Sequence, residues 1–140
     1  KVASPDDWKT EPMPESTREA STLKLSIPVS NEAMSIIQKG HIPEAQEDHW
    51  FMYCDDEYIR YYRSWTGMCA FEAHYHKETE CFIIDELTIN HALAQFGVNG
   101  DEAAMRLFKY LITVETGEDA AEAWQDYIDA WEKSDCLYHL

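Results

Sequence analysis

The feature that most constrains the fold is a series of four strand-length segments joined by short polar turns. The segments are rich in aromatic and apolar residues and lie at 49–54, 58–65, 68–76 and 81–87. The turns between them read "DDE", "TG" and "KETE". Strands joined this closely pair with their chain neighbours in antiparallel fashion, because a parallel pair needs a long crossover connection. The sequence therefore predicts a four-stranded antiparallel meander over about 49–87.

After Asn90 the period of the apolar residues changes from two toward 3.6. Helices with one apolar side are expected at about 101–115 and 118–133. Asp101 is the expected N-cap of the first of these helices. Strands grouped before helices are typical of an α+β fold, in which we expect these helices to pack against one face of the sheet.

The chain ahead of the meander divides into a leader and the beginning of the domain. Residues 1–22 hold three of the five prolines and little periodicity, which predicts a mobile N-terminal leader or linker. Trp8 is the exception, since a lone Trp in such a segment either docks on the domain or stays exposed. A single domain is expected over 23–140. It starts with the alternating run "LKLSIPVS", a short edge strand, followed by a short helix at 31–39 that Ser30 caps.

The charge of the chain argues against two classes of partner. The net charge is −16, from 27 acidic and 11 basic residues, and nucleic acid and anionic membranes both require a basic surface. No run approaches the ~20 apolar residues that span a bilayer. The four cysteines form no C-x-x-C pair, which favours free thiols in a cytoplasmic protein. A secreted protein with disulfides is the open alternative.

The run "YYRSWTG" at 61–67 contains the candidate ligand site. Alternation along a strand places Arg60 and Arg63 on opposite faces, so that one can pair with an internal carboxylate while the other holds an anionic or polar ligand. The predicted ligand-binding residues are Trp50, Tyr62, Arg63, Ser64 and Trp65. The alternative is structural: Trp65 packs in the core, Arg63 braces the turn through an internal salt bridge, and Thr66-Gly67 closes the hairpin. A surface for a protein partner is a third possibility.

Two arrangements along the third strand are candidates for metal binding or catalysis. Glu72, His74 and His76 recur at every second position, but the outer two lie ~13 Å apart along a strand, which is too far for one ion. The sequence therefore predicts no metal and no cofactor. A hydrolase would need Ser64 or Cys69 beside one of these histidines, and binding without turnover is favoured over this enzyme.

The second helix of the C-terminal pair supports an alternative function. Residues 115–135 hold eight acidic residues and one lysine. A rigid acidic helix could block a basic partner, as inhibitor and immunity-type proteins do. The sequence does not specify the ligand, the basic partner or the oligomeric state.

One segment resembles a known family. The run "DHWFMYCDDEYIRYYRSWTGMCAFEAHY" at 48–75 is similar to a small, mainly bacterial domain of unassigned function, with a W-F-x-Y strand followed by R-S-W-T-G. The matching residues are Asp48, Trp50, Phe51 and Tyr53, then Arg63 through Gly67, then Phe71. The family often has a histidine directly before this arginine, where Tyr62 stands here. The resemblance implies a compact α+β domain and assigns no activity.

Overall fold

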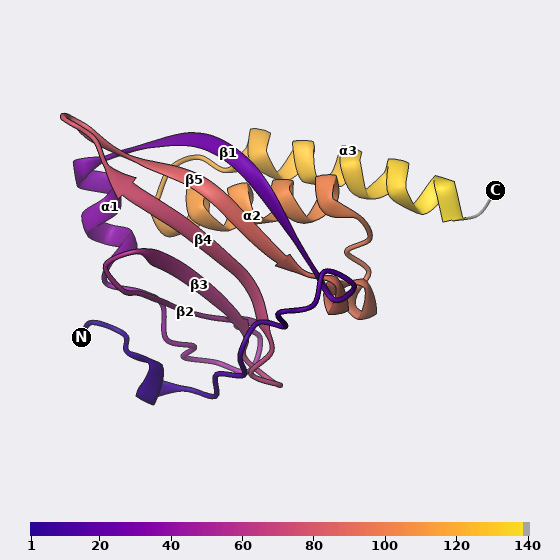
Figure 1. Ribbon diagram of the computed structural model, residues 1–140, viewed down its shortest axis with the longest axis horizontal. Helices are drawn as coiled ribbons and strands as arrows, with labels where there is room; N and C mark the ends of the chain where they lie inside the picture. The colour runs from indigo at the N-terminus through magenta and orange to yellow at the C-terminus, as the bar shows by residue number, and fades with distance from the viewer. Residues whose placement is uncertain (139–140) are drawn as a thin grey trace. The chain divides into compact units, whose positions relative to one another are not determined.

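The fold is α+β, as the sequence predicts, and it consists of two compact units (Figure 1). The computed structural model describes the backbone of residues 1–138 and the side chains of residues 1–133. The first unit, Lys1–Asn90, is an antiparallel sheet with one short α-helix, and the described residues of the second unit, His91–Leu140, form helices and their connections.

The sheet has five strands in the order β1-β5-β4-β3-β2, so the predicted number of four is wrong by one. The four predicted segments are neighbours in the sheet and form the expected meander. The fifth strand comes from the predicted edge segment, which pairs with β5. The strands are β1 (Ala20–Ser30), β2 (Trp50–Cys54), β3 (Tyr58–Arg63), β4 (Cys69–Lys77) and β5 (Cys81–Asn90).

Strand β1 explains the difference in strand number. It begins at Ala20, inside the predicted leader, and pairs with β5 as far as Ser30. Pro28 lies opposite Ile83, and an edge strand accepts proline because one of its sides has no neighbouring strand to receive a hydrogen bond. A register shift between Lys24 and Ile27 also interrupts this edge.

A β-bulge in β4 changes which side chains share a face. Tyr61 lies opposite Phe71 and Tyr62 lies opposite Cys69, so Ala70 is the additional residue. Simple alternation predicts that Cys69 and Phe71 point the same way. This prediction is wrong, because one inserted residue moves Cys69 to the face of Tyr62.

The register defines two faces of the sheet, which we name after two neighbouring tyrosines. The Tyr61 face is apolar and buried, and it includes Met52, Ile59, Tyr61, Phe71, Ala73, Leu87 and Ile89. The Tyr62 face mixes aromatic and charged side chains, and it includes Phe51, Tyr53, Tyr58, Arg60, Tyr62, Cys69, Glu72 and His74.

The short helix α1 (Asn31–Ile37) follows β1 and confirms the predicted helix, although it ends two residues early. The Ser30 hydroxyl accepts a hydrogen bond from the Ala33 amide at 3.1 Å, as expected of an N-cap. Gly40 adopts a φ of 77° after the helix, a conformation that glycine reaches without steric cost.

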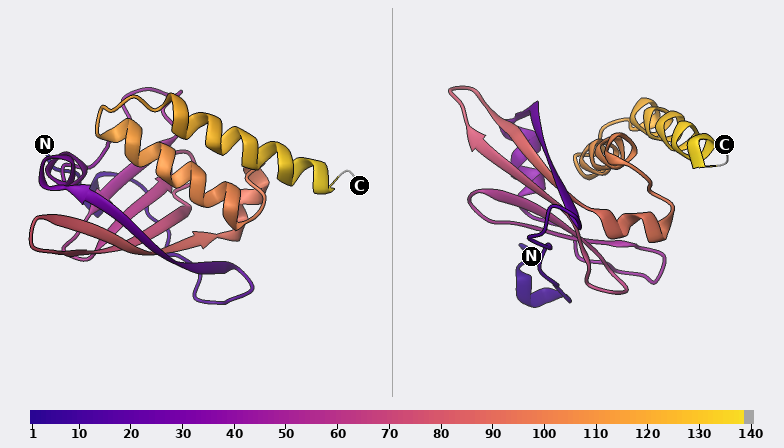
Figure 2. Two further views of the ribbon diagram at one scale, coloured as in Figure 1. Left: turned by 90° about the horizontal axis from the view of Figure 1, so that it is seen from above. Right: turned by 45° about the vertical axis from the view of Figure 1, so that its right-hand side comes forward.

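The second unit contains the 3₁₀-helix η2 (His91–Phe96) and the helices α2 (Asp101–Glu115) and α3 (Ala121–Tyr138). The N-cap of α2 is Gly100 and not Asp101, which is the first helical residue. The helices α2 and α3 run side by side (Figure 2), with the rings of Tyr110 and Trp124 4.9 Å apart. Packing of these helices on the sheet stays a prediction. Among the described residues, no helix combines the length and apolar character needed to span a bilayer.

Candidate functional site

The residues "RSWTG" form a closed turn between β3 and β4. The Arg63 amide donates to the carbonyl of Met68 at 2.9 Å, and the Gly67 amide donates to the carbonyl of Arg63 at 2.8 Å. The Thr66 hydroxyl accepts a hydrogen bond from the Met68 amide at 3.1 Å. Gly67 has a φ of 78°, a backbone conformation that glycine adopts without steric cost. The glycine at this position therefore allows the chain to reverse here. Thr66 and Gly67 thus close the hairpin, as the structural alternative expects.

Arg63 lies on the Tyr61 side of the sheet, against an aromatic ring. It pairs with Trp50 across β2 and β3, and its guanidinium carbon is 5.0 Å from the centre of the Trp50 ring. The side chain is half-buried, and this burial lowers the pKa of Arg63 from its ordinary value. A cation over an indole is stabilised more strongly where water is partly excluded. The Arg63 guanidinium therefore packs against the Trp50 ring.

Trp65 does not pack in the core, which contradicts that part of the structural alternative. Its side chain is 63% exposed, although the indole N–H donates to the Gln46 carbonyl at 3.1 Å. This hydrogen bond fixes the ring position while most of the ring surface faces solvent. A fixed, exposed indole is a common anchor for a bound ligand or protein.

Tyr62 and Ser64, in contrast, are each only 4% exposed. The Ser64 hydroxyl donates to the carbonyl of Asp48 at 2.8 Å, which ties the turn to the chain ahead of β2. The Tyr62 hydroxyl donates to the Tyr53 hydroxyl at 3.5 Å, and burial raises the pKa of Tyr62 above its ordinary value. The five predicted site residues therefore divide: Trp50 and Arg63 are half-buried and Trp65 is exposed, whereas Ser64 is buried and Tyr62 is buried on the opposite face of the sheet from Trp50 and Arg63.

The N-terminal residues contact this turn, which the sequence did not predict beyond the possible docking of Trp8. The Trp8 indole N–H donates to the Ser64 carbonyl at 2.7 Å, and the Lys9 ammonium donates to the Trp65 carbonyl at 3.3 Å. Trp8 was the only available signal, since an isolated large apolar residue in a polar segment gains free energy by docking. The division into a leader and a domain at residue 22 stays a prediction.

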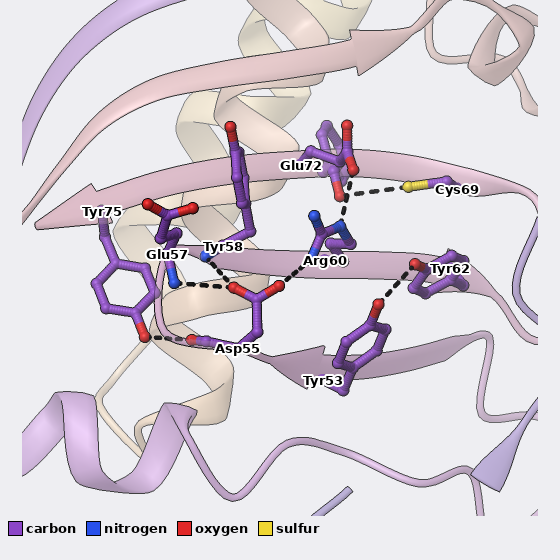
Figure 3. A network of polar contacts seen from close by, with 10 residues as sticks. Tyr53, Asp55, Glu57, Tyr58, Arg60, Tyr62, Cys69, Glu72 and Tyr75 are labelled. Atoms are coloured by element: carbon purple, nitrogen blue, oxygen red, sulfur yellow. Dashed lines mark hydrogen bonds and ion pairs between the residues drawn. The ribbon is translucent and has the colours of Figure 1, made fainter. Parts of the chain in front are cut away.

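The other arginine of β3, Arg60, is braced internally (Figure 3). Its guanidinium donates to Glu72 at 2.7 Å and to Asp55 at 2.5 Å, and it lies 4.6 Å from the centre of the Tyr58 ring. Partial burial by itself would lower the pKa of Arg60, but the hydrogen bonds to Glu72 and Asp55 outweigh it and raise the pKa. Arg60 thus fills the internal role that the sequence assigned to one of the two arginines.

A second polar cluster lies farther along the Tyr62 face. The imidazole of His74 donates through Nδ1 to the Asp85 carboxylate at 2.7 Å, and Nδ1 of His76 donates to its other oxygen. Nε2 of His76 donates to Glu78 at 2.8 Å. Within the part of the chain whose side chains are described, no three His, Cys, Asp or Glu side chains are arranged to hold a metal ion.

This cluster predicts a pH dependence of stability. Hydrogen bonds from His76 to Glu78 and Asp85 raise the pKa of His76 above 6.5, its ordinary value. Its contribution to stability is therefore complete below about pH 6.5 and is lost as the pH rises through the folded-state pKa. We expect His76→Gln to lower the melting temperature at pH 5.5 and to have a smaller effect at pH 8.5. Calorimetry at both pH values checks this, and an equal loss at both would contradict it.

The possible nucleophiles occupy positions that do not favour a hydrolase. Burial raises the pKa of the Cys69 thiol to about 12, so the thiolate that attacks a substrate is scarce at neutral pH. Cys69 donates weakly to the Phe71 carbonyl at 3.8 Å, and Ser64 donates to a backbone carbonyl as described above. Cys136 lies outside the residues whose side chains are described.

Comparisons with protein-family models, with curated proteins and with solved structures found no match to this chain. The structure itself defines the class as an α+β protein built on a five-stranded antiparallel sheet. The resemblance of residues 48–75 to a bacterial domain family stays a prediction.

Proposed function

We propose that this protein binds a small anionic or polar ligand at the turn that follows β3. The observation that carries the proposal is that one turn carries the Arg63 guanidinium, which packs on the Trp50 ring, and an exposed indole, Trp65, in a chain of net charge −16. Arg63 begins the turn and is held against Trp50, while Lys9 donates to the carbonyl of Trp65. Basic groups set in an acidic surface attract anions selectively.

Each residue has a defined role in this proposal. Arg63 donates two parallel hydrogen bonds to a carboxylate or phosphate, the geometry that a planar guanidinium favours. Trp65 covers an apolar part of the ligand, and Trp50 holds the guanidinium in position. Ser64 supports the turn through its hydrogen bond to the Asp48 carbonyl, and Tyr62 lies behind it, on the other face of the sheet. The proposed site belongs to a small domain of the predicted bacterial family, and it binds its ligand without chemical turnover.

The test is the loss of binding on replacing Arg63. Thermal shift and calorimetric titration with citrate, small dicarboxylates and inorganic phosphate identify an anion that binds the wild-type chain. Arg63→Ala should then weaken its binding about 10- to 100-fold, the usual loss for one charge-assisted hydrogen-bonded group.

Two controls separate a binding role from a structural one. Arg106→Ala removes the same charge from α2, where Arg106 pairs with Glu102, and should leave the affinity unchanged. Arg63→Lys keeps the charge but loses the planar pair of donors, and should recover part of the affinity. Unfolding of Arg63→Ala, or unchanged affinity in a folded variant, would contradict the proposal.

The alternative function is an acidic protein that binds a basic partner through α3. In the part of α3 whose side chains are described, the exposed acidic residues are Glu122, Asp126, Asp129 and Glu132, and Trp124 is 44% exposed. A pull-down from the native cell extract should then recover a basic protein that added salt releases. The triple variant D126N/D129N/E132Q should lose this protein. Equal recovery of the basic protein by the wild-type chain and the triple variant, or recovery that added salt does not reduce, would count against this function.

A cytoplasmic location is also part of the proposal. Cys69 and Cys81 are free thiols, which agrees with a reducing compartment.

A further inference from the structure

Residues 1–13 complete an apolar cluster on the Tyr62 face of the sheet. The buried members of this cluster are Ala3, Phe51, Tyr62 and Cys69, and partly buried side chains pack around them. Trp8 stacks on Phe51 with ring centres 6.4 Å apart and an angle of 24° between the planes. The N-terminal segment therefore supplies three side chains, Ala3, Trp8 and Met13, to a cluster whose other residues lie on β2, β3 and β4 or, for Ile42, ahead of β2.

The segment is held in the manner of a bound peptide, through contacts with backbone carbonyls at both of its ends. The Ala3 amide donates to Lys39 and the Glu11 amide donates to Gly67, both at 2.8 Å. Between them, the Trp8 indole N–H donates to the carbonyl of Ser64 at 2.7 Å. In Figure 1 the indigo N-terminal segment runs along the side of the sheet that carries β2 and β3. These three bonds define the direction and register of the segment.

Two glycines leave room for the segment. A Cβ atom on Gly40 would lie 2.5 Å from the Cβ of Ala3, and one on Gly67 would lie 2.8 Å from the Cβ of Lys9. At Gly67 the backbone carbonyl of Lys9 is also only 3.2 Å away. Real Cβ atoms do not approach other atoms so closely without displacement. The surface is thus shaped to receive a backbone at both ends of the segment.

The segment also has local structure of its own. Pro5–Asp7 forms the 3₁₀-helix η1, in which the Asp7 amide donates to the carbonyl of Ser4 at 3.0 Å. The Asp7 carboxylate accepts a hydrogen bond from the Ser4 amide at 2.8 Å and pairs with Lys1. A segment with a turn of its own loses less conformational entropy when it docks.

We propose that this surface, which we call the Trp8 site, is a peptide-binding site and that residues 1–13 are its ligand within the same chain. Its partner class is a peptide of the same chemistry. Such a peptide carries a small residue that packs against Gly40 and, five positions later, a tryptophan that stacks on Phe51. Three positions beyond the tryptophan, a backbone amide donates to the carbonyl of Gly67. This mode of recognition uses main-chain hydrogen bonds for register and one aromatic anchor for specificity. The inference does not depend on Arg63, because every contact that carries it is made by other residues.

The test uses the full-length chain and a synthetic peptide of residues 1–13. Trp8→Ala in the chain empties the anchor position, and the peptide should then bind and shift the backbone NMR signals of Ser64 and Gly67. The wild-type chain should bind the same peptide at least about 10-fold more weakly, because its own segment competes at an effective concentration in the millimolar range. A peptide carrying the Trp8→Ala change should not bind either chain.

Three results would overturn the proposal. The first is that the peptide does not bind a folded Trp8→Ala chain. The second is that peptides with and without tryptophan bind equally. The third is that the wild-type chain forms a dimer by exchange of the segment and does not bind the peptide. If the Trp8→Ala chain does not fold, a protease site inserted between Glu15 and Ser16 of the full chain replaces it. After cleavage the segment should stay bound and be displaced by added peptide, whereas its immediate loss at micromolar concentration would also overturn the proposal.

Discussion

Replacing Gly40 with alanine is expected to reduce the free energy of unfolding by about 3 kcal/mol. Two costs add together: a left-handed φ costs an alanine about 1–2 kcal/mol, and forcing an extra methyl into a filled position costs about 1–3 kcal/mol. The new Cβ would lie 2.6 Å from the Met52 carbonyl oxygen, which is backbone and part of the bridge between His41 and Met52. Urea denaturation followed by circular dichroism measures this loss.

Gly117→Ala is the matched control for this substitution. Gly117 has the same φ of 77°, but no heavy atom lies within 4 Å of the Cβ position there. This variant should therefore show only the backbone cost of about 1–2 kcal/mol. Equal losses in the two variants would mean that the contacts of Gly40 with Ala3 and Met52 carry no energetic weight.

Replacing Arg60 with methionine is expected to cost about 2–3 kcal/mol at pH 7. Its side chain is only 18% exposed and it holds two carboxylates, so the substitution leaves Glu72 and Asp55 without their cation. Removing one partner of a fully buried pair costs about 3–5 kcal/mol, and we expect less here because Asp55 is 47% exposed. Methionine keeps most of the apolar length of the side chain, so the loss reports the charge rather than the packing.

The pH dependence of this loss gives a second measurement. Burial alone would raise the pKa of Asp55, but hydrogen bonds from the Glu57 amide, Arg60 and the Tyr58 amide lower it below 3.8. The contribution of Asp55 to stability is therefore present above pH 3.8 and is lost as the pH falls through the folded-state pKa. The difference between wild type and Arg60→Met should shrink at pH 3.

Lys24→Met provides the control for Arg60 within the same sheet. Lys24 also forms an ion pair, with Glu86, but its side chain is 85% exposed. Solvent screens a surface pair this exposed, so the variant should unfold close to wild type. A loss for Lys24→Met as large as that for Arg60→Met would contradict the distinction between the two pairs.

The sequence predicted the strands and helices well because their signals are local. Alternation and short turns located β2, β3, β4 and β5, and the change of period located α2 and α3. The cap of α1 followed from Ser30, whose hydroxyl needs only residues three positions away. The ends of elements were predicted less accurately. The N-cap of α2 is Gly100 and not the predicted Asp101, and the φ of 90° at this cap is one that glycine adopts without steric cost.

The candidate site was predicted only in part. The opposite placement of Arg60 and Arg63 follows from strand geometry and is confirmed by their partners, Tyr53 and Trp50. Which arginine takes the internal role depends on Glu72, twelve residues away, and on the Asp55 turn, so the sequence could not assign it. The exposure of Trp65 was equally undecided, since a tryptophan after a strand can pack inward or outward.

The sequence by itself determined the α+β class, the antiparallel meander and the separation of the two arginines, because these depend on the residue period and on turns a few residues long. Only the tertiary structure decided that β1 joins the sheet beside β5, that the bulge at Ala70 turns Cys69 toward Tyr62, and that Trp8 docks beside Ser64. Each of these contacts joins residues distant in sequence or depends on a single inserted residue. Their free energy comes from packing and hydrogen bonds that exist only after the chain has folded.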